Sequence, residues 1–133
     1  MSTLIRVALL GCALAAVPAN AAEWTPSAWV DEDTVELRTT APGEEPYWFK
    51  VWLVVIDDQV YVRLGSRAAN RIEENQTAPV IGVRLAGQEF DRVKGVPAPE
   101  KAEAVAEAIG DKYWSDIFIR LVPHPLTLRL EPE

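Results

Sequence analysis

The chain has 133 residues, of which 20 are acidic and 13 are basic, and its net charge is −7. A charge of this sign repels phosphate backbones, so nucleic-acid binding is not expected. Almost half of the residues are hydrophobic and only one is cysteine, so stability must come from a packed core rather than from disulfide bonds.

The first 21 residues have the order of a cleavable export signal. Arg6 precedes an apolar run over residues 7–17, and the small residues Ala19-Asn20-Ala21 follow it. We expect cleavage after Ala21, so that residues 22–133 form the mature protein in the periplasm or outside the cell. The apolar run is shorter than the ~20 residues that cross a bilayer core, and no later stretch is long enough, so no membrane span is expected.

A second interpretation of this segment concerns Cys12. The sequence Leu9-Leu10-Gly11-Cys12 resembles the lipobox of bacterial lipoproteins, which would place a lipid on Cys12. The apolar run continues past Cys12 to a good cleavage site, which favours cleavage after Ala21. Cleavage there removes the only cysteine and brings the net charge to about −8. No flexible linker or internal repeat divides the remaining ~110 residues, so we predict a single domain.

The first half of the mature chain predicts an arm followed by strands. Residues 23–33 contain two tryptophans among turn-forming residues, which indicates an irregular arm or short helix that covers an apolar edge. Residues 35–39 alternate in polarity, as a half-buried strand does. Residues 47–56 and 60–64 are rich in aromatic and β-branched side chains and flank Asp57-Asp58-Gln59, which predicts a hairpin.

A two-residue turn at Asp57-Asp58 fixes the register of this hairpin. One face then consists of three apolar cross-strand pairs, which are Val55 with Val60, Leu53 with Val62, and Val51 with Leu64. The other face is aromatic and basic and carries Trp48, Lys50, Trp52, Tyr61 and Arg63. Arg63 is expected directly across from Trp52. The tryptophans need a partner subunit, the arm or a flat ligand to cover them, and we predict a homodimer.

A short helix is predicted from Ser66, its natural N-cap, to about Glu74. We expect its buried side to consist of Ala68, Ala69 and Ile72. Arg67 and Arg71 are placed in its first turns, where cations oppose the helix dipole, and a phosphate bound to the free amides would relieve this conflict. The alternative is ordinary N-capping with solvated arginines, which the sequence alone favours.

The rest of the chain predicts a second hairpin, a helix and a final strand. Residues 79–85 and 88–96 flank Ala86-Gly87, and the second of these strands is more polar and is expected near a sheet edge. Apolar residues at helical spacing follow Pro99 to about Tyr113, and residues 126–130 alternate as a strand. The order favours an antiparallel barrel with two helices, a mainly β protein of the α+β class.

From about residue 35 to residue 132 the chain resembles the split β-barrel superfamily of pyridoxamine-phosphate oxidases and deazaflavin-dependent nitroreductases, especially a small uncharacterised branch. The resemblance rests on residues 49–55, residues 60–69, Lys112-Tyr113-Trp114 and residues 126–132. It implies a six-stranded antiparallel split β-barrel with two short to medium helices. In this superfamily a dimer commonly binds flavin mononucleotide (FMN) or a related flavin between its subunits. The resemblance implicates Lys50, Arg63, Ser66 and Arg67 at the phosphate. The aromatic face of the hairpin adds the expectation that Trp52 or Trp48 covers the ring system.

The resemblance therefore implies an FMN-binding protein, and a flavin-dependent oxidoreductase of undefined substrate is one hypothesis. Ala68 stands where the superfamily often has a lysine, and export would leave the chain where flavin is scarce. The second hypothesis is thus an exported, cofactor-free binding or dimeric structural module on the same barrel. Flavin, deazaflavin and haem are not distinguished by the sequence.

Other candidate chemistry in the sequence is weaker. His124 lies between two prolines without a second histidine or a thiolate, so we predict a loop residue and no metal site. The carboxylate pairs Asp57-Asp58 and Glu73-Glu74 suit a turn and a solvated helix end, so no catalytic residue is assigned. Asn75-Gln76-Thr77 matches a glycosylation sequon, which we interpret as accidental because the signal looks bacterial.

Overall fold

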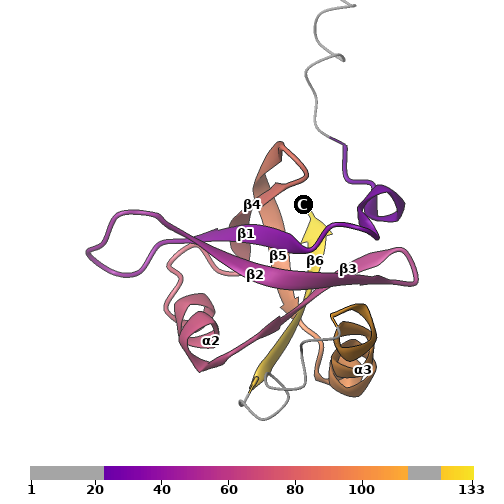
Figure 1. Cartoon of the computed structure of the whole chain (residues 1–133). Helices are drawn as coiled ribbons and strands as arrows, with labels where there is room; N and C mark the ends of the chain where they lie inside the picture. Colours follow the sequence, from indigo (N-terminus) through magenta and orange to yellow (C-terminus); the bar gives the residue numbers. More distant parts are fainter. Residues whose placement is uncertain (1–22, 114–123) are drawn as a thin grey trace, which may run out of the picture.

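The strands of the computed structural model form a closed antiparallel barrel in the order β1-β2-β3-β6-β5-β4 (Figure 1). The structure describes residues 23–113 and 124–133. The strands are β1 (Thr34–Thr39), β2 (Tyr47–Ile56), β3 (Gln59–Leu64), β4 (Val80–Leu85), β5 (Gln88–Pro97) and β6 (Leu126–Pro132). The helical segments are η1 (Pro26–Trp29), α2 (Ser66–Glu73), η2 (Pro99–Lys101) and α3 (Ala102–Lys112). The predicted fold class is therefore confirmed.

The predicted export signal and Cys12 lie outside the described residues, as does Trp114. Cleavage after Ala21 and location outside the cytoplasm stay predictions. Among the described residues, no helix is long and apolar enough to cross a membrane.

The β2–β3 hairpin has the predicted turn. Asp57 and Asp58 have positive φ angles of 50° and 61°, as a type I′ turn requires. The cross-strand pairs are Leu53 with Val62, Val54 with Tyr61, Val55 with Val60, and Ile56 with Gln59. Two of the three predicted apolar pairs are thus confirmed.

The two strands part beyond the pair of Leu53 and Val62. The third predicted pair, Val51 with Leu64, is absent, and Arg63 does not face Trp52 in the ladder. Arg63 and Leu64 pair only with Thr127 and Leu126 of β6, because β3 has turned from β2 toward the strand that closes the barrel. The first half of β2 therefore keeps only β1 as its neighbour.

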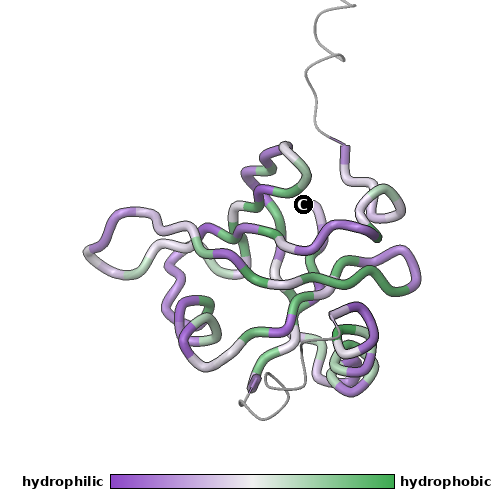
Figure 2. The backbone as a smooth tube through the Cα atoms, in the orientation of Figure 1, coloured by the Kyte–Doolittle hydropathy of each residue, from purple (hydrophilic) through white to green (hydrophobic). Residues whose placement is uncertain are grey.

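The interior of the barrel is filled by aliphatic side chains from all six strands. The fully buried members with the largest volumes include Leu37, Leu53, Leu64, Leu128 and Leu130. Hydrophobic segments accordingly concentrate on the strands, while the loops and outer helix faces are more hydrophilic (Figure 2). The burial of these side chains is the main source of stability.

The N-terminal arm covers an apolar part of the barrel, as predicted. Trp24 and Trp29 lie edge to face with their ring centroids 5.0 Å apart. Both rings also contact Phe90 of β5, with centroid distances of 5.1 Å and 5.8 Å. Both tryptophan rings of the arm therefore pack against aromatic residues of their own chain.

A second, smaller apolar cluster lies outside the barrel, where α3 covers the β2–β3 hairpin (Figure 1). Val105 and Ile109 of α3 pack there against Val54 and Tyr61. This cluster confirms the helical spacing after Pro99 and buries Tyr61, one of the residues on the aromatic and basic face of the hairpin.

The prediction that the 88–96 strand lies near a sheet edge is wrong. Strand β5 pairs with β4 on one side and with β6 on the other. Its polar residues alternate with buried ones such as Val93 and Gly95, because one face of β5 points into the barrel and its outer face is solvated. The polarity of residues 88–96 therefore indicates an outward face of the barrel and not an edge strand.

Helix α2 also differs from expectation in two details. Its N-cap is Gly65 rather than Ser66, and no side chain caps it, so Ser66 is its first residue and is exposed. Arg71 lies in the last turn, where a cation is favourable for the dipole. Only Arg67 therefore opposes the dipole.

Asn75 is a buried polar residue just beyond α2, with 6% of its surface exposed. Its side-chain oxygen accepts a hydrogen bond from the backbone N–H of Thr40 at 3.1 Å, and its amide nitrogen donates to the Val80 carbonyl at 2.9 Å. The hydroxyl of Thr77 donates to the same Asn75 oxygen at 3.1 Å. Asn75 thus ties the end of β1 to the start of β4.

Candidate functional site

A groove of about 810 Å³ lies between the first half of β2 and the β3–α2 junction, where the two strands part. All five residues predicted at the cofactor line it, namely Lys50, Trp52, Arg63, Ser66 and Arg67. The volume lies within the range of about 300–1,000 Å³ that small-molecule sites occupy. The structure thus brings the five residues together, and their role in binding a ligand stays a prediction.

Arg63 has an unmet hydrogen bond. Its Nη1 atom is buried and has no hydrogen-bond partner among the described residues. A buried donor without a partner costs about 1–3 kcal/mol, and more when it is charged. An anion bound to the Arg63 guanidinium would offer this group a partner that the described residues do not provide.

The described arginines outside the groove differ from Arg63 in this respect, because each of them has a carboxylate partner. Their ion pairs are Arg38 with Asp91 at 3.8 Å, Arg84 with Glu89 at 2.8 Å, Arg92 with Glu133, and Arg129 with Glu131 at 2.6 Å and Glu100 at 3.8 Å. In the groove, Arg71 is 3.9 Å from Glu44. Arg63, Arg67 and Lys50 form no ion pair with a described residue.

The start of α2 supplies the polar wall of the groove. Gly65 is extended, with φ −71° and ψ 176°, and turns β3 into the helix at Ser66. Ser66 and Arg67 are exposed, and neither side chain bonds to a described residue. A hydroxyl, a guanidinium and the first amides of a helix together are suited to bind a phosphate.

Ala68 follows them and packs against the barrel core. It therefore supplies no cation where the superfamily often has a lysine.

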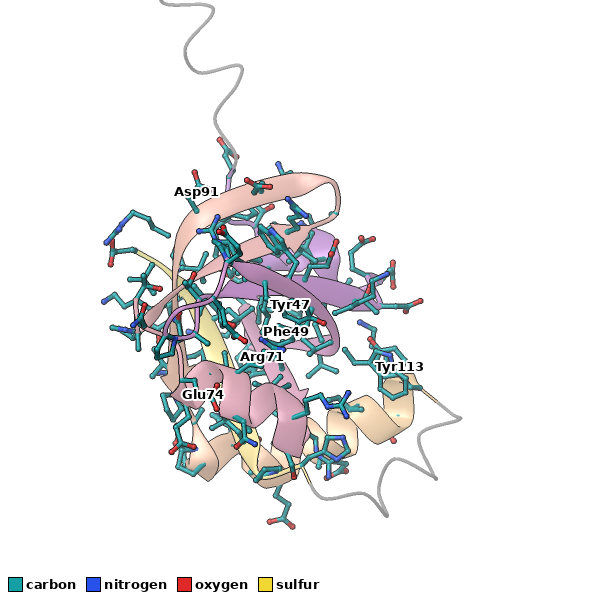
Figure 3. The ribbon with its side chains drawn as sticks, turned by 90° about the vertical axis from the view of Figure 1, so that its left-hand side faces the viewer. Tyr47, Phe49, Arg71, Glu74, Asp91 and Tyr113 are labelled. Atoms are coloured by element: carbon teal, nitrogen blue, oxygen red, sulfur yellow. The ribbon has the colours of Figure 1, made fainter. Side chains whose placement is uncertain are left out.

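Aromatic rings form the other side of the groove. Trp52 stacks on Tyr113, with ring centroids 4.6 Å apart and an angle of 15° between the rings. Tyr47 and Phe49 also line the groove and stack at 6.3 Å, and the Arg71 guanidinium lies 3.9 Å from the Tyr47 ring. Figure 3 shows Tyr47, Phe49 and Arg71 close together above α2, with Tyr113 on the α3 side.

Trp48 does not line the groove, although it shares a strand face with Trp52. Its ring lies between two guanidinium groups, with Arg84 at 3.8 Å and Arg38 at 5.4 Å. Both tryptophans of the hairpin face thus have a cover from their own chain, since Tyr113 lies on Trp52. The exposed tryptophan face that motivated the homodimer prediction is smaller than expected.

Tyr113 and Lys112 hold the wall of the groove to the N-terminal arm. The Tyr113 hydroxyl donates toward the Leu53 carbonyl at 3.0 Å and the Asp33 carbonyl at 2.5 Å. The Lys112 ammonium donates to the carbonyls of Leu53 and Glu32. Burial, and then the nearby Asp33 carboxylate, raise the pKa of Tyr113 to about 12. The neutral phenol that supports Trp52 is therefore retained well above pH 7.

Several groove residues were missed from the sequence, notably Tyr47, Phe49, Arg71 and His124. His124 lies outside the helices and strands, as predicted, but it also lines the groove. The alternation of Tyr47 and Phe49 with Trp48 could have indicated a second aromatic face. Nothing local to His124 indicates its position, which depends on the path of the chain into β6.

No metal site or carboxylate dyad is found in the described part of the chain. Residues 23–113 and 124–133 contain no group of three or more potential metal-ligating side chains. Asp57 and Asp58 lie in the turn of the β2–β3 hairpin, and Glu73 and Glu74 lie exposed at the end of α2. None of these carboxylates lines the groove.

Comparison with solved structures supports the split-barrel assignment. The heme storage protein HutZ from Vibrio cholerae matches with a TM-score of 0.58 and 20% identity over 80% of this chain and 87% of that one. The conserved hypothetical protein Rv2991 from Mycobacterium tuberculosis matches with a TM-score of 0.56 and 17% identity over 77% and 75% of the two chains. An F420-H2 dependent reductase, FDR-A, matches with a TM-score of 0.55 and 9% identity over 75% and 95%.

These likenesses show that the chain has the split-barrel fold. No protein-family model matches the sequence, and no curated protein matches it.

Proposed function

We propose that the groove binds FMN and that the protein is an FMN-binding split-barrel protein. The observation that carries the proposal is the buried Nη1 of Arg63, which has no partner in the described part of the chain. Arg63 lines a groove with Ser66 and Arg67 on one side and aromatic rings on the other. A ligand that joins a phosphate to a flat ring system fits both halves of this groove.

In this proposal the β3–α2 junction holds the phosphate. Arg63 and Arg67 would donate charge-assisted hydrogen bonds to it, each worth about 1.5–3 kcal/mol, and the Ser66 hydroxyl would donate another. Trp52 would cover the ring system, held in orientation by Tyr113. Bound FMN supplies the redox chemistry of the isoalloxazine ring, and the chain would supply its position and its shielding from water.

The structural neighbours include both a reductase and a heme storage protein, so the likeness supports a cofactor without choosing one. Heme is the second candidate ligand because His124, a residue type that ligates heme iron, also lines the groove. A flavin-dependent oxidoreductase remains the proposed activity, with its substrate undefined. A cofactor-free, exported module is the alternative, and the absence of a cation at position 68 favours it.

The test is the absorption spectrum of the mature protein purified from its native compartment, followed by titration with FMN. A flavin spectrum, or quenching of tryptophan fluorescence by FMN at micromolar concentration, would support the proposal. A heme spectrum would replace FMN with heme. No bound chromophore and no quenching at high micromolar FMN would leave the cofactor-free module.

Two further proposals concern the state of the protein in the cell. The first is export with cleavage after Ala21, which intact-mass measurement tests, since a retained or lipidated Cys12 would contradict it. The second is a homodimer, and Tyr47, with 48% of its surface exposed beside the groove, is the exposed aromatic that supports it. Sedimentation at micromolar concentration tests the dimer, and a monomer would contradict it.

A further inference from the structure

We infer that the groove binds a second anionic group, a carboxylate or a phosphate on the molecule that meets the flavin, and that Lys50 holds it. This inference rests on the proposed function and specifies its substrate class. Neither the fold nor the neighbours assign such a group. It follows from the distribution of charge along the walls of the groove.

The groove has more positive charge than one phosphate can balance. None of its described lining residues is acidic, although the chain as a whole has a net charge of −7. Lys50, Arg63 and Arg67 have no ion pair with a described residue. A phosphate monoester carries a charge of about −1.5 to −2 at pH 7, so roughly one positive charge is left over after FMN has bound.

The left-over charge is assigned to Lys50 by its position. Arg63 and Arg67 come from the β3–α2 junction together with Ser66, whereas Lys50 comes from β2 on the other side of the gap between the strands. The two arginines have planar guanidinium groups that match a phosphate in two-point contact. Lys50 carries a point charge on a flexible stem, which suits a ligand that binds and dissociates rapidly.

One candidate for neutralising Lys50 is the carboxylate of Glu36. Glu36 lies across from Lys50 in the β1–β2 ladder. The two side chains nevertheless form no ion pair within hydrogen-bonding or salt-bridge distance, and Lys50 is exposed. Lys50 also borders a smaller hollow that Glu32, Glu36 and Glu89 line. Lys50 thus borders the groove as an exposed cation that forms no ion pair with a described carboxylate.

The test compares benzoate with benzamide, a neutral molecule of nearly the same shape, on the FMN-loaded mature protein. Binding is measured by the change in flavin absorbance and independently by tryptophan fluorescence. We expect benzoate to bind at least ~10-fold more tightly than benzamide, because its carboxylate gains a charge-assisted bond from Lys50. Lys50→Met should remove most of this preference, while it should weaken FMN less than Arg63→Met does.

The matched control is Lys94→Met, which changes an exposed lysine of β5 that does not line the groove. This variant should keep the preference for benzoate. Equal binding of the two probes, or a preference that survives Lys50→Met, would overturn the inference while leaving FMN binding intact.

The failure of the proposed function would look different, because FMN itself would not bind. The two probes are then titrated into the FMN-free protein and into its Lys50→Met variant. A benzoate preference that Lys50→Met removes would support anion binding by Lys50 in the absence of flavin. No preference in the FMN-free protein would overturn the inference together with the function.

Discussion

At the barrel surface covered by the N-terminal arm, Trp24, Trp29 and Phe90 contact one another edge to face, and Trp29 is only 2% exposed. In the groove, Trp52 has one neighbouring ring, and the Arg63 guanidinium near it has a buried nitrogen without a partner. The rings of the first region pack against one another within the described chain, whereas the Arg63 nitrogen of the second has no hydrogen-bond partner among the described residues. The difference teaches that an aromatic cluster is a candidate ligand site where a polar group beside it has no hydrogen-bond partner among the described residues.

The interruption between β2 and β3 explains why the two regions differ. Where strands are paired, side chains on neighbouring strands lie about 5 Å apart and can satisfy one another. Beyond Leu53 and Val62 the two strands diverge, so Lys50 and Trp52 of β2 have no partner on β3, and Arg63 has none on β2. All three line the groove between the strands. We therefore expect substitutions at the covered surface to change stability and substitutions in the groove to change ligand binding.

The largest effect is expected at the covered surface. Trp29→Ala should lower the free energy of unfolding by about 3–5 kcal/mol, because it removes a buried ring from the aromatic cluster. Urea denaturation measures this loss. Val30→Ala is the control, because Val30 is 50% exposed and should change stability by no more than ~0.5 kcal/mol. Similar losses in both variants would contradict the role given to the arm.

The second largest effect is a loss of FMN affinity without a loss of stability, and it is expected at Arg63 in the groove. Arg63→Met should weaken FMN binding ~10-fold or more, because a charge-assisted bond is lost. The stability of the ligand-free protein should stay the same or rise, because a buried nitrogen without a partner is removed.

Arg129→Met is the matched control for this experiment. Arg129 is paired with Glu100 and Glu131 and lies outside the groove, so its loss should cost up to ~1 kcal/mol of stability and leave FMN affinity unchanged. Isothermal titration and urea denaturation measure both quantities. If Arg63→Met destabilised the ligand-free protein as much as Arg129→Met does, Arg63 would be a structural residue.

A third, smaller effect concerns the tryptophan that does not face the groove. Arg84→Ala should lower stability by about 0.5–1 kcal/mol, because it removes the guanidinium 3.8 Å from the Trp48 ring. FMN affinity should not change, since Trp48 does not line the groove. A loss of FMN affinity in this variant would mean that the ligand site extends over Trp48.

The smallest effect is a change in how the free energy of unfolding depends on pH. Burial, and then Asp33, raise the pKa of Tyr113 from its ordinary value of 10.0 to about 12, so the folded chain keeps a proton that the unfolded chain has lost between these values. The free energy of unfolding should therefore fall as the pH rises from about 10 to about 12. Tyr113→Phe should remove the part of this fall that is due to the tyrosine.

Lys112 is the other titrating group at this position, and burial lowers its pKa. Its contribution has the opposite sign, since the folded chain releases this proton before the unfolded chain does. The difference between wild type and Tyr113→Phe in urea denaturation from about pH 9 to about pH 12 isolates the tyrosine. If the free energy of unfolding changed with pH at the same slope in the two proteins, Tyr113 would titrate in the same way in the folded and unfolded states.

Much of the fold could be predicted from local sequence. Strand β2 has the bounds that the aromatic and β-branched run indicated, and Asp57-Asp58 forms the turn that sets the register next to it. These features depend on neighbours in the chain. Whether β5 has one or two neighbours depends on β6, more than thirty residues away, and its polarity could not reveal the closure.

The same distinction applies to the site. Lys50, Trp52 and Arg63 were placed together by the register of one hairpin, and Ser66 and Arg67 follow directly in the chain. The reason they share a groove was nevertheless wrong in detail, because Arg63 pairs with Thr127 and not with Trp52. The contribution of His124 could not be predicted, because it requires the whole barrel to close.

The buried position of Asn75 has a consequence for the choice of expression host. A secreting eukaryotic cell attaches a glycan to an Asn-X-Thr site while the chain is still unfolded, and Asn75-Gln76-Thr77 fits that pattern. A sugar on the amide nitrogen would displace its bond to the Val80 carbonyl, and the bulk of the glycan would have no space beside Thr40. Material from such a host would thus contain a fraction unable to join β1 to β4, whereas a bacterial host yields the chain unmodified at this position.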